Sequence, residues 1–173
     1  LSDEQLAVLT PAQVRAIDVA DLQALANGDL TVLTSAQIAA LSAEQFAGLT
    51  AGQIAAIDAT DLQGVSTAVL AQMTTTQVQA LTPAQVTALS AGQLNALSNT
   101  QFNALTAGQV AAIDTADIAA LTTAKVAALS TDVIVALTTA QIAAWDAGQV
   151  AALKPAQITA IEIGDIAALS PAR

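Results

Sequence analysis

An eight-residue sequence repeat, here called an octad, recurs from Ser2 to the end of this 173-residue chain without an insertion or deletion. The first position of each octad is almost always Ser, Thr or Asp, and the fourth is mostly Gln or Asp. The fifth is always apolar, the seventh is usually Ala and the eighth is usually Leu, as in Thr82-Pro83-Ala84-Gln85-Val86-Thr87-Ala88-Leu89. A fixed short period indicates a repeat architecture in which each unit is stabilised by its neighbours.

The octad has the pattern of a helix start. A first-position Ser, Thr or Asp can accept a hydrogen bond from the first turn, and Gln three residues later can complete a capping box. The apolar residue before the cap and the fifth-position residue form a hydrophobic staple. All four prolines, Pro11, Pro83, Pro155 and Pro171, directly follow a first-position residue. That is the first helical position, where a missing N–H costs nothing.

One continuous helix does not fit the period, because eight residues at about 100° each leave a drift of about 80° per octad. We therefore predict one short helix per octad. Such helices are marginal alone and must stack, so the expected fold is an all-α solenoid. The alternative is a β-solenoid with eight-residue rungs. It is disfavoured because apolar positions five and eight break the two-residue alternation of a strand, and because alanine is a poor strand former.

The composition narrows the classes of function. Fourteen acidic and four scattered basic residues give a net charge of −10, so we expect no nucleic-acid partner and no binding to an anionic membrane surface. The longest apolar runs are too short to span a bilayer, and we expect no membrane insertion. His and Cys are absent, which excludes zinc and thiol sites and removes the base of a Ser-His-Asp triad. We therefore expect no enzyme activity and no cofactor.

Four octads form a subtype with Ile before an acidic first position and Asp at the fourth. Their carboxylates form the acidic pairs Asp18 and Asp21, Asp58 and Asp61, Asp114 and Asp117, and Glu162 and Asp165. Paired carboxylates on one helix turn are candidate ligands for weak Ca²⁺ binding, since Ca²⁺ takes several oxygen ligands. The alternative is that the first-position acids cap helices and interact favourably with the helix dipole.

Two families share parts of this phrase. Leu9-Thr10-Pro11-Ala12-Gln13-Val14-Arg15-Ala16-Ile17 resembles the opening of a TAL-effector DNA-binding repeat. Those repeats are about four times longer, carry a base-reading loop and are basic, so the likeness covers only the helix start. Over its whole length the chain resembles the Ala-, Thr- and Gln-rich arrays of large bacterial secreted or surface proteins, as in the segments 122–129 and 138–145. That resemblance implies an extracellular spacer or stalk.

We therefore predict a single octapeptide-repeat solenoid over residues 1–173, cut from a longer array whose flanking repeats or modules are its partners. The expected function is that of a non-enzymatic, rod-like spacer in a bacterial secreted or cell-surface protein. The alternative is a solenoid binding module that recognises a protein, a cation such as Ca²⁺, or ice on one repetitive face.

Overall fold

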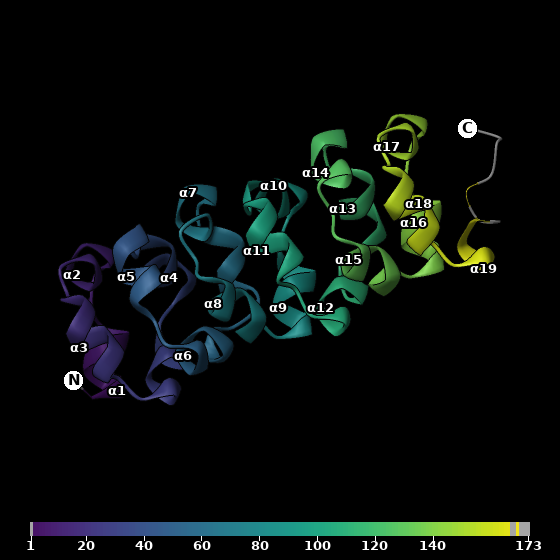
Figure 1. Ribbon diagram of the computed structural model, residues 1–173. Coiled ribbons are helices and arrows are strands. Elements are labelled where there is room, and N and C mark those ends of the chain that lie inside the picture. Colours follow the sequence, from purple (N-terminus) through teal and green to yellow (C-terminus); the bar gives the residue numbers. More distant parts are fainter. Residues whose placement is uncertain (1, 167–168, 170–173) are drawn as a thin grey trace.

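The computed structural model describes residues 2–166 and residue 169, and within this range every octad forms one short helix (Figure 1). The prediction of an all-α solenoid is confirmed, and the described residues contain no strand. Two of the helices, η1 and η2, are 3₁₀. The elements are α1(Asp3–Ala7), α2(Pro11–Arg15), α3(Val19–Ala24), η1(Asn27–Val32), α4(Ser35–Ala40), α5(Ala43–Gly48), α6(Ala51–Ala56), η2(Asp61–Gly64), α7(Thr67–Leu70), α8(Thr75–Ala80), α9(Pro83–Ala88), α10(Ala91–Ala96), α11(Asn99–Asn103), α12(Ala107–Ala111), α13(Thr115–Ala119), α14(Thr123–Ala127), α15(Thr131–Ala136), α16(Thr139–Ala143), α17(Ala147–Ala151), α18(Pro155–Ala160) and α19(Ile163–Ile166).

The capping box predicted from the sequence starts most of these helices. In α9, the Gln85 N–H donates to the Thr82 hydroxyl at 3.2 Å, and the Thr82 N–H donates to Gln85 Oε1 at 2.7 Å. Pro83 occupies the first helical position, as Pro11 and Pro155 do in α2 and α18; Pro171 lies outside the described residues. Leu89 then adopts extended backbone and ends the helix. Each octad is therefore one capped helix followed by a bend.

The fifth- and eighth-position side chains form one continuous core along the array. Every fifth-position residue from Leu6 to Ile142 is buried, and so is every eighth-position residue from Leu33 to Ile161. Phe46, Phe102, Met73 and Trp145 occupy core positions, as expected for residues that fill space among aliphatic side chains. Among the residues that the structure describes, no helix is long and apolar enough to cross a bilayer.

Fourth-position glutamines join successive turns of the solenoid. The Gln85 amide donates from Nε2 to the Ile54 carbonyl and to the Ile57 carbonyl, both at 2.7 Å. These acceptors lie 31 and 28 residues earlier, at the fifth and eighth positions of the octad four units back. The same pair of bonds recurs at Gln37, Gln45, Gln53, Gln77, Gln93, Gln101, Gln109, Gln141, Gln149 and Gln157. We call these eleven residues the glutamine ladder.

The pitch of the superhelix follows from two sets of contacts. The ladder joins each octad to the fourth one before it, while the helices themselves pack three octads apart, as α12 does with α9 and α15. Each octad therefore packs between the third and the fourth octad that precede it in the chain. One turn of the superhelix thus takes between three and four octads. Figure 1 shows the result as an elongated array with α1 at one end and α19 at the other.

The ladder can be tested with two identical pentapeptides. Residues 10–14 and 82–86 share the sequence Thr-Pro-Ala-Gln-Val and both form capping boxes. Gln85 is buried in the ladder, whereas Gln13 is exposed and its amide donates to no carbonyl among the described residues. Gln85→Glu should lower the free energy of unfolding by about 2–4 kcal/mol, because a buried carboxylate then faces two carbonyl oxygens. Gln13→Glu should be nearly neutral.

Chemical denaturation monitored by circular dichroism measures both changes. Burial and the facing carbonyls should raise the pKa of the carboxyl introduced by Gln85→Glu, so its protonated form is favoured in the folded state. The stability lost at neutral pH should therefore return as the pH falls through that raised pKa. Equal effects of the two substitutions would contradict the role assigned to the ladder.

Candidate functional site

In each acidic pair, the first-position residue lies between two helices and the fourth-position aspartate lies in the following helix. The first-position residues Asp18, Asp58, Asp114 and Glu162 are all exposed. Among the fourth-position residues, Asp21 is exposed, and Asp61, Asp117 and Asp165 are half-buried. Each pair lies on its own octad, and the structure does not bring the four pairs together.

The expectation that first-position acids of these pairs cap helices is wrong for the pairs in which the cap is described. Asp18 and Asp114 occupy the N-cap positions of α3 and α13 but make no side-chain cap bond. Asp58 accepts hydrogen bonds from the N–H and hydroxyl of Thr60 at 2.9 and 2.8 Å. Its helix, η2, begins only after Thr60.

The fourth-position residue distinguishes these pairs from a regular cap. Asp146 also occupies a first position, but its fourth-position partner is Gln149, and it accepts the Gln149 N–H at 2.7 Å as a regular cap. In the pairs, a second carboxylate replaces that glutamine. Burial raises the pKa of Asp117, the Ala91 N–H lowers it by a smaller amount, and the charge of Asp114 raises it further. Two like charges on one turn are disfavoured, and the first carboxylates of the Asp18 and Asp114 pairs make no side-chain bond to the helix start.

The fourth-position aspartates instead contact the octad three units earlier. Asp165 Oδ1 accepts the Thr139 hydroxyl at 2.5 Å, and Asp61 Oδ1 accepts the Ser35 hydroxyl. A carboxylate cannot donate, so it cannot make the two bonds that a ladder glutamine makes. At Asp61 and Asp165, hydroxyl contacts between turns therefore replace the bonds of the glutamine ladder.

Two further breaks in the ladder are repaired by asparagine, which the sequence analysis missed. At Lys125 and Val133 no fourth-position oxygen is present to accept the first-position N–H. Asn95 Oδ1 accepts the Thr122 N–H at 3.0 Å, and Asn103 Oδ1 accepts the Ser130 N–H at 2.8 Å. Their amides donate to the Ala120 and Ala128 carbonyls. The available signal was that both asparagines occupy a sixth position, four octads before an octad that lacks Gln or Asp at its fourth position.

Lys125 is the one charged side chain buried in the described core. Its Nζ donates to the Leu97 carbonyl and lies 5.7 Å from the centre of the Phe102 ring. Burial lowers the pKa of Lys125. The side chain thus takes the place of a ladder glutamine at one of the two usual acceptors, Leu97, with its ammonium group near an aromatic face.

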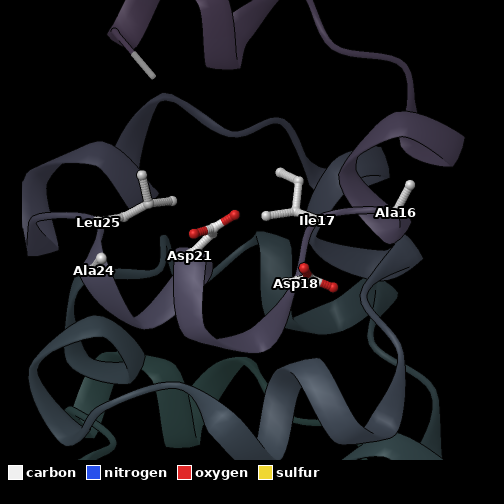
Figure 2. A pocket seen from close by; sticks show the side chains of 6 residues that line it. All are labelled: Ala16, Ile17, Asp18, Asp21, Ala24 and Leu25. Atoms are coloured by element: carbon white, nitrogen blue, oxygen red, sulfur yellow. The ribbon is translucent and has the colours of Figure 1, made fainter.

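The acidic pairs offer few ligands to a metal ion. In the described part of the chain, no group of three or more Asp, Glu, His or Cys side chains gathers at one place. A pocket of about 490 Å³ does lie beside one pair, lined by Ala16, Ile17, Asp18, Asp21, Ala24 and Leu25. Figure 2 shows Ile17, Asp21 and Leu25 pointing into the same space on one side of α3. Weak Ca²⁺ binding at the pairs stays a prediction.

Comparison with known proteins identifies the repeat. A family model described as the ALTTAQ repeat matches residues 14–51, 54–91, 110–144 and 134–160, which together cover more than half of the chain. No curated protein and no solved structure matches the chain. The matched segments contain seven of the eleven ladder glutamines and three of the four acidic pairs, whereas Asn95 and Asn103 lie between matched segments.

The acidic octads provide a second test of the ladder. Asp117→Gln should raise the free energy of unfolding by about 1–2 kcal/mol at neutral pH, because the amide can reach the Val86 and Leu89 carbonyls and the half-buried carboxylate is removed. Asp117→Asn is the matched control, since its amide is neutral but one methylene shorter. The free energy of unfolding should rise less for Asp117→Asn than for Asp117→Gln.

The gain from Asp117→Gln should depend on pH. Burial raises the pKa of Asp117. Protonation of this carboxyl therefore stabilises the folded parent protein in acid, and this stabilisation is lost as the pH rises. The stability difference between variant and parent should therefore shrink as the pH falls toward about 4. Urea denaturation at several pH values measures this difference in the free energy of unfolding. An equal increase for Asp117→Asn would show that removal of the charge, and not the new amide bonds, stabilises the variant.

Calcium binding has a direct test in the melting temperature. A ligand that binds only the folded protein raises Tm by mass action. We expect millimolar Ca²⁺ to leave Tm unchanged, because each pair supplies two carboxylates and Ca²⁺ takes six to eight oxygens. The control replaces the four pairs by Ser and Gln, the residues of the ordinary octad. A Ca²⁺-dependent rise that disappears in this variant would establish the pairs as binding sites.

Proposed function

The chain belongs to the ALTTAQ repeat family, and from that premise we propose that it is a non-enzymatic, rod-like spacer or stalk segment of a secreted or cell-surface bacterial protein. The observation that carries the proposal is the glutamine ladder. Each ladder residue fixes its octad to a set place on the preceding turn, so the length of the rod is set by the number of octads.

The chemistry of the side chains supports a structural role. The sequence has no His and no Cys, and the eleven ladder glutamines are engaged in contacts between turns. The charged residues are mostly acidic. A negative, mostly polar exterior around a continuous apolar core suits an array that must stay soluble while it separates other parts of a protein. The secreted or surface location rests on the resemblance to bacterial surface arrays.

The spacer role can be tested by lengthening the rod. Residues 74–105 form four consecutive octads, all with a ladder glutamine. A variant that carries a second copy of residues 74–105 directly after Leu105 keeps the octad phase and the asparagine contacts downstream. Its maximum dimension in small-angle X-ray scattering should grow by about one turn of the solenoid, and its helicity per residue should stay the same.

A matched control breaks the phase. Insertion of residues 74–101 after Leu105 adds three and a half octads, so core and exterior positions exchange at the junction. This variant should lose helicity and unfold more readily near the insertion. A compact particle, or an in-phase variant that is no longer than the parent chain, would contradict a rod whose length is set by octad number.

A further inference from the structure

The asparagine side chains of this array lie in two different surroundings. Asn95 and Asn103 occupy sixth positions, and their amides are bonded to main-chain groups of later octads. Asn27 and Asn99 both occupy the second position of an octad, and both are exposed. Only Asn27 is followed by glycine, whereas a β-branched threonine follows Asn99. Asn27 and Asn99 are therefore a matched pair that differs in the next residue and in how the local turn is held.

The helix that begins at Asn27 has no capping hydroxyl. Ala26 precedes it and has no side-chain oxygen, so the start of η1 is held by a bond from the Ala26 N–H to the Asp29 carboxylate at 2.8 Å. Asp29 also lacks the amide with which a ladder glutamine reaches the preceding turn. A 3₁₀ helix has poorer hydrogen-bond geometry than an α-helix. We therefore expect the first turn of η1 to open more readily than that of a capped helix.

The turn that carries Asn99 is held much more firmly. The Gln101 N–H donates to the Ser98 hydroxyl at 3.1 Å, and the Ser98 N–H donates to Gln101 Oε1 at 2.6 Å. The amide of Gln101 also donates to the carbonyls of Leu70 and Met73 on the preceding turn. Asn99 is thus an exposed asparagine on a turn that is fixed by both the capping box and the ladder.

The main-chain nitrogen of Gly28 is open to reaction. Its N–H belongs to the first turn of η1, where N–H groups lack an intrahelical acceptor, and none of the described residues accepts it. A Cβ built on Gly28 would meet no atom within 4 Å. This exposure is a property of the octad, because the second- and third-position residues Asn99 and Gly108 in the middle of the array are exposed as well. The Asn27 amide itself lies against Gly52 of α6.

We propose that Asn27 is a site of spontaneous deamidation. The main-chain nitrogen of Gly28 loses its proton to base and attacks Cγ of Asn27, so that a C–N bond forms. The bond from Cγ to Nδ2 breaks, and Nδ2 takes a proton from water and leaves as ammonia. Water then opens the resulting succinimide at either carbonyl, which leaves aspartate or isoaspartate at this position. The net reaction consumes one water and releases one ammonia, and it needs no enzyme or oxidant.

Both products should loosen the contact between η1 and α6. These two helices pack against each other, and the side chain of Asn27 forms part of that contact. Either product adds one negative charge to the net charge of −10, two residues before Asp29. Isoaspartate also lengthens the main chain by one methylene group within an array of strict period. Hydrogen exchange should therefore become faster in η1 and α6 and stay unchanged in distant octads, because contacts in an array join neighbouring turns.

Peptide mapping by mass spectrometry of the folded chain, sampled over time, measures the conversion of each asparagine. Asn27 should deamidate at least about ten times faster than Asn99, which corresponds to a barrier lower by about 1.4 kcal/mol. The rate at Asn27 should rise from neutral to mildly alkaline pH, since base removes the proton of the Gly28 nitrogen. Hydrogen exchange of the converted protein then locates the loosened helices.

Three substitutions separate the causes of the reaction. Gly28→Ala places its methyl group in open space, at a residue without positive φ, and removes the main-chain freedom of glycine. It should slow the reaction at Asn27 by a similar factor. Gly108→Ala, at the same octad position and equally unobstructed, should leave that rate unchanged. Ala26→Ser supplies the missing capping hydroxyl and should also slow the reaction.

Circular dichroism of each variant establishes that it is folded. Deamidation at Asn27 that is no faster than at Asn99 in the parent chain would overturn the proposal. A rate at Asn27 that is unaffected by Gly28→Ala would overturn it as well, because the attack by the Gly28 nitrogen is then not the step that controls the conversion.

Discussion

The structure depends on how very short helices satisfy their last carbonyl groups. A helix of five or six residues leaves most of its carbonyls without an intrahelical N–H, and burying them unpaired would cost about 1–3 kcal/mol each. Here the amide of a glutamine from the next turn bridges the fifth- and eighth-position carbonyls of the octad four units back, such as those of Ile54 and Ile57. The Ile54 carbonyl also accepts the Ile57 N–H, whereas the Ile57 carbonyl depends on the glutamine. The same residue closes the capping box of its own helix through Oε1. One side chain thus starts one helix and terminates another, which fixes both the helix length and the stacking of turns.

Much of the fold could be predicted from the sequence because local interactions determine it. The cap, the staple and the placement of Pro11, Pro83 and Pro155 specify where each helix begins, and the structure agrees. A further clue was available in the fourth position, which never contains Glu although Glu also completes a capping box. Of Gln and Glu, only Gln supplies an amide donor as well as an acceptor. The absence of Glu indicates that the amide bonds to something outside its own helix.

Other features could not be read from the octad because they depend on contacts between turns. The number of octads per turn follows from contacts 25 to 31 residues apart, which no local pattern specifies. Asn95 and Asn103 act on octads 27 residues later, so their role is invisible without the superhelix. The contacts of the acidic octads also lie between turns, because Asp61 and Asp165 accept hydroxyl groups of the preceding turn.

The exchange of glutamine side-chain amide protons, followed by nuclear magnetic resonance in deuterated solvent, tests the ladder most directly. If each ladder amide is buried and bonded to two carbonyls of the preceding turn, the amides of residues such as Gln85 and Gln93 should exchange slowly, at rates set by opening of the array. The exposed amides of Gln5 and Gln13 should exchange as fast as those of free glutamine. Uniformly fast exchange of all glutamine amides in a folded, helical protein would contradict the ladder.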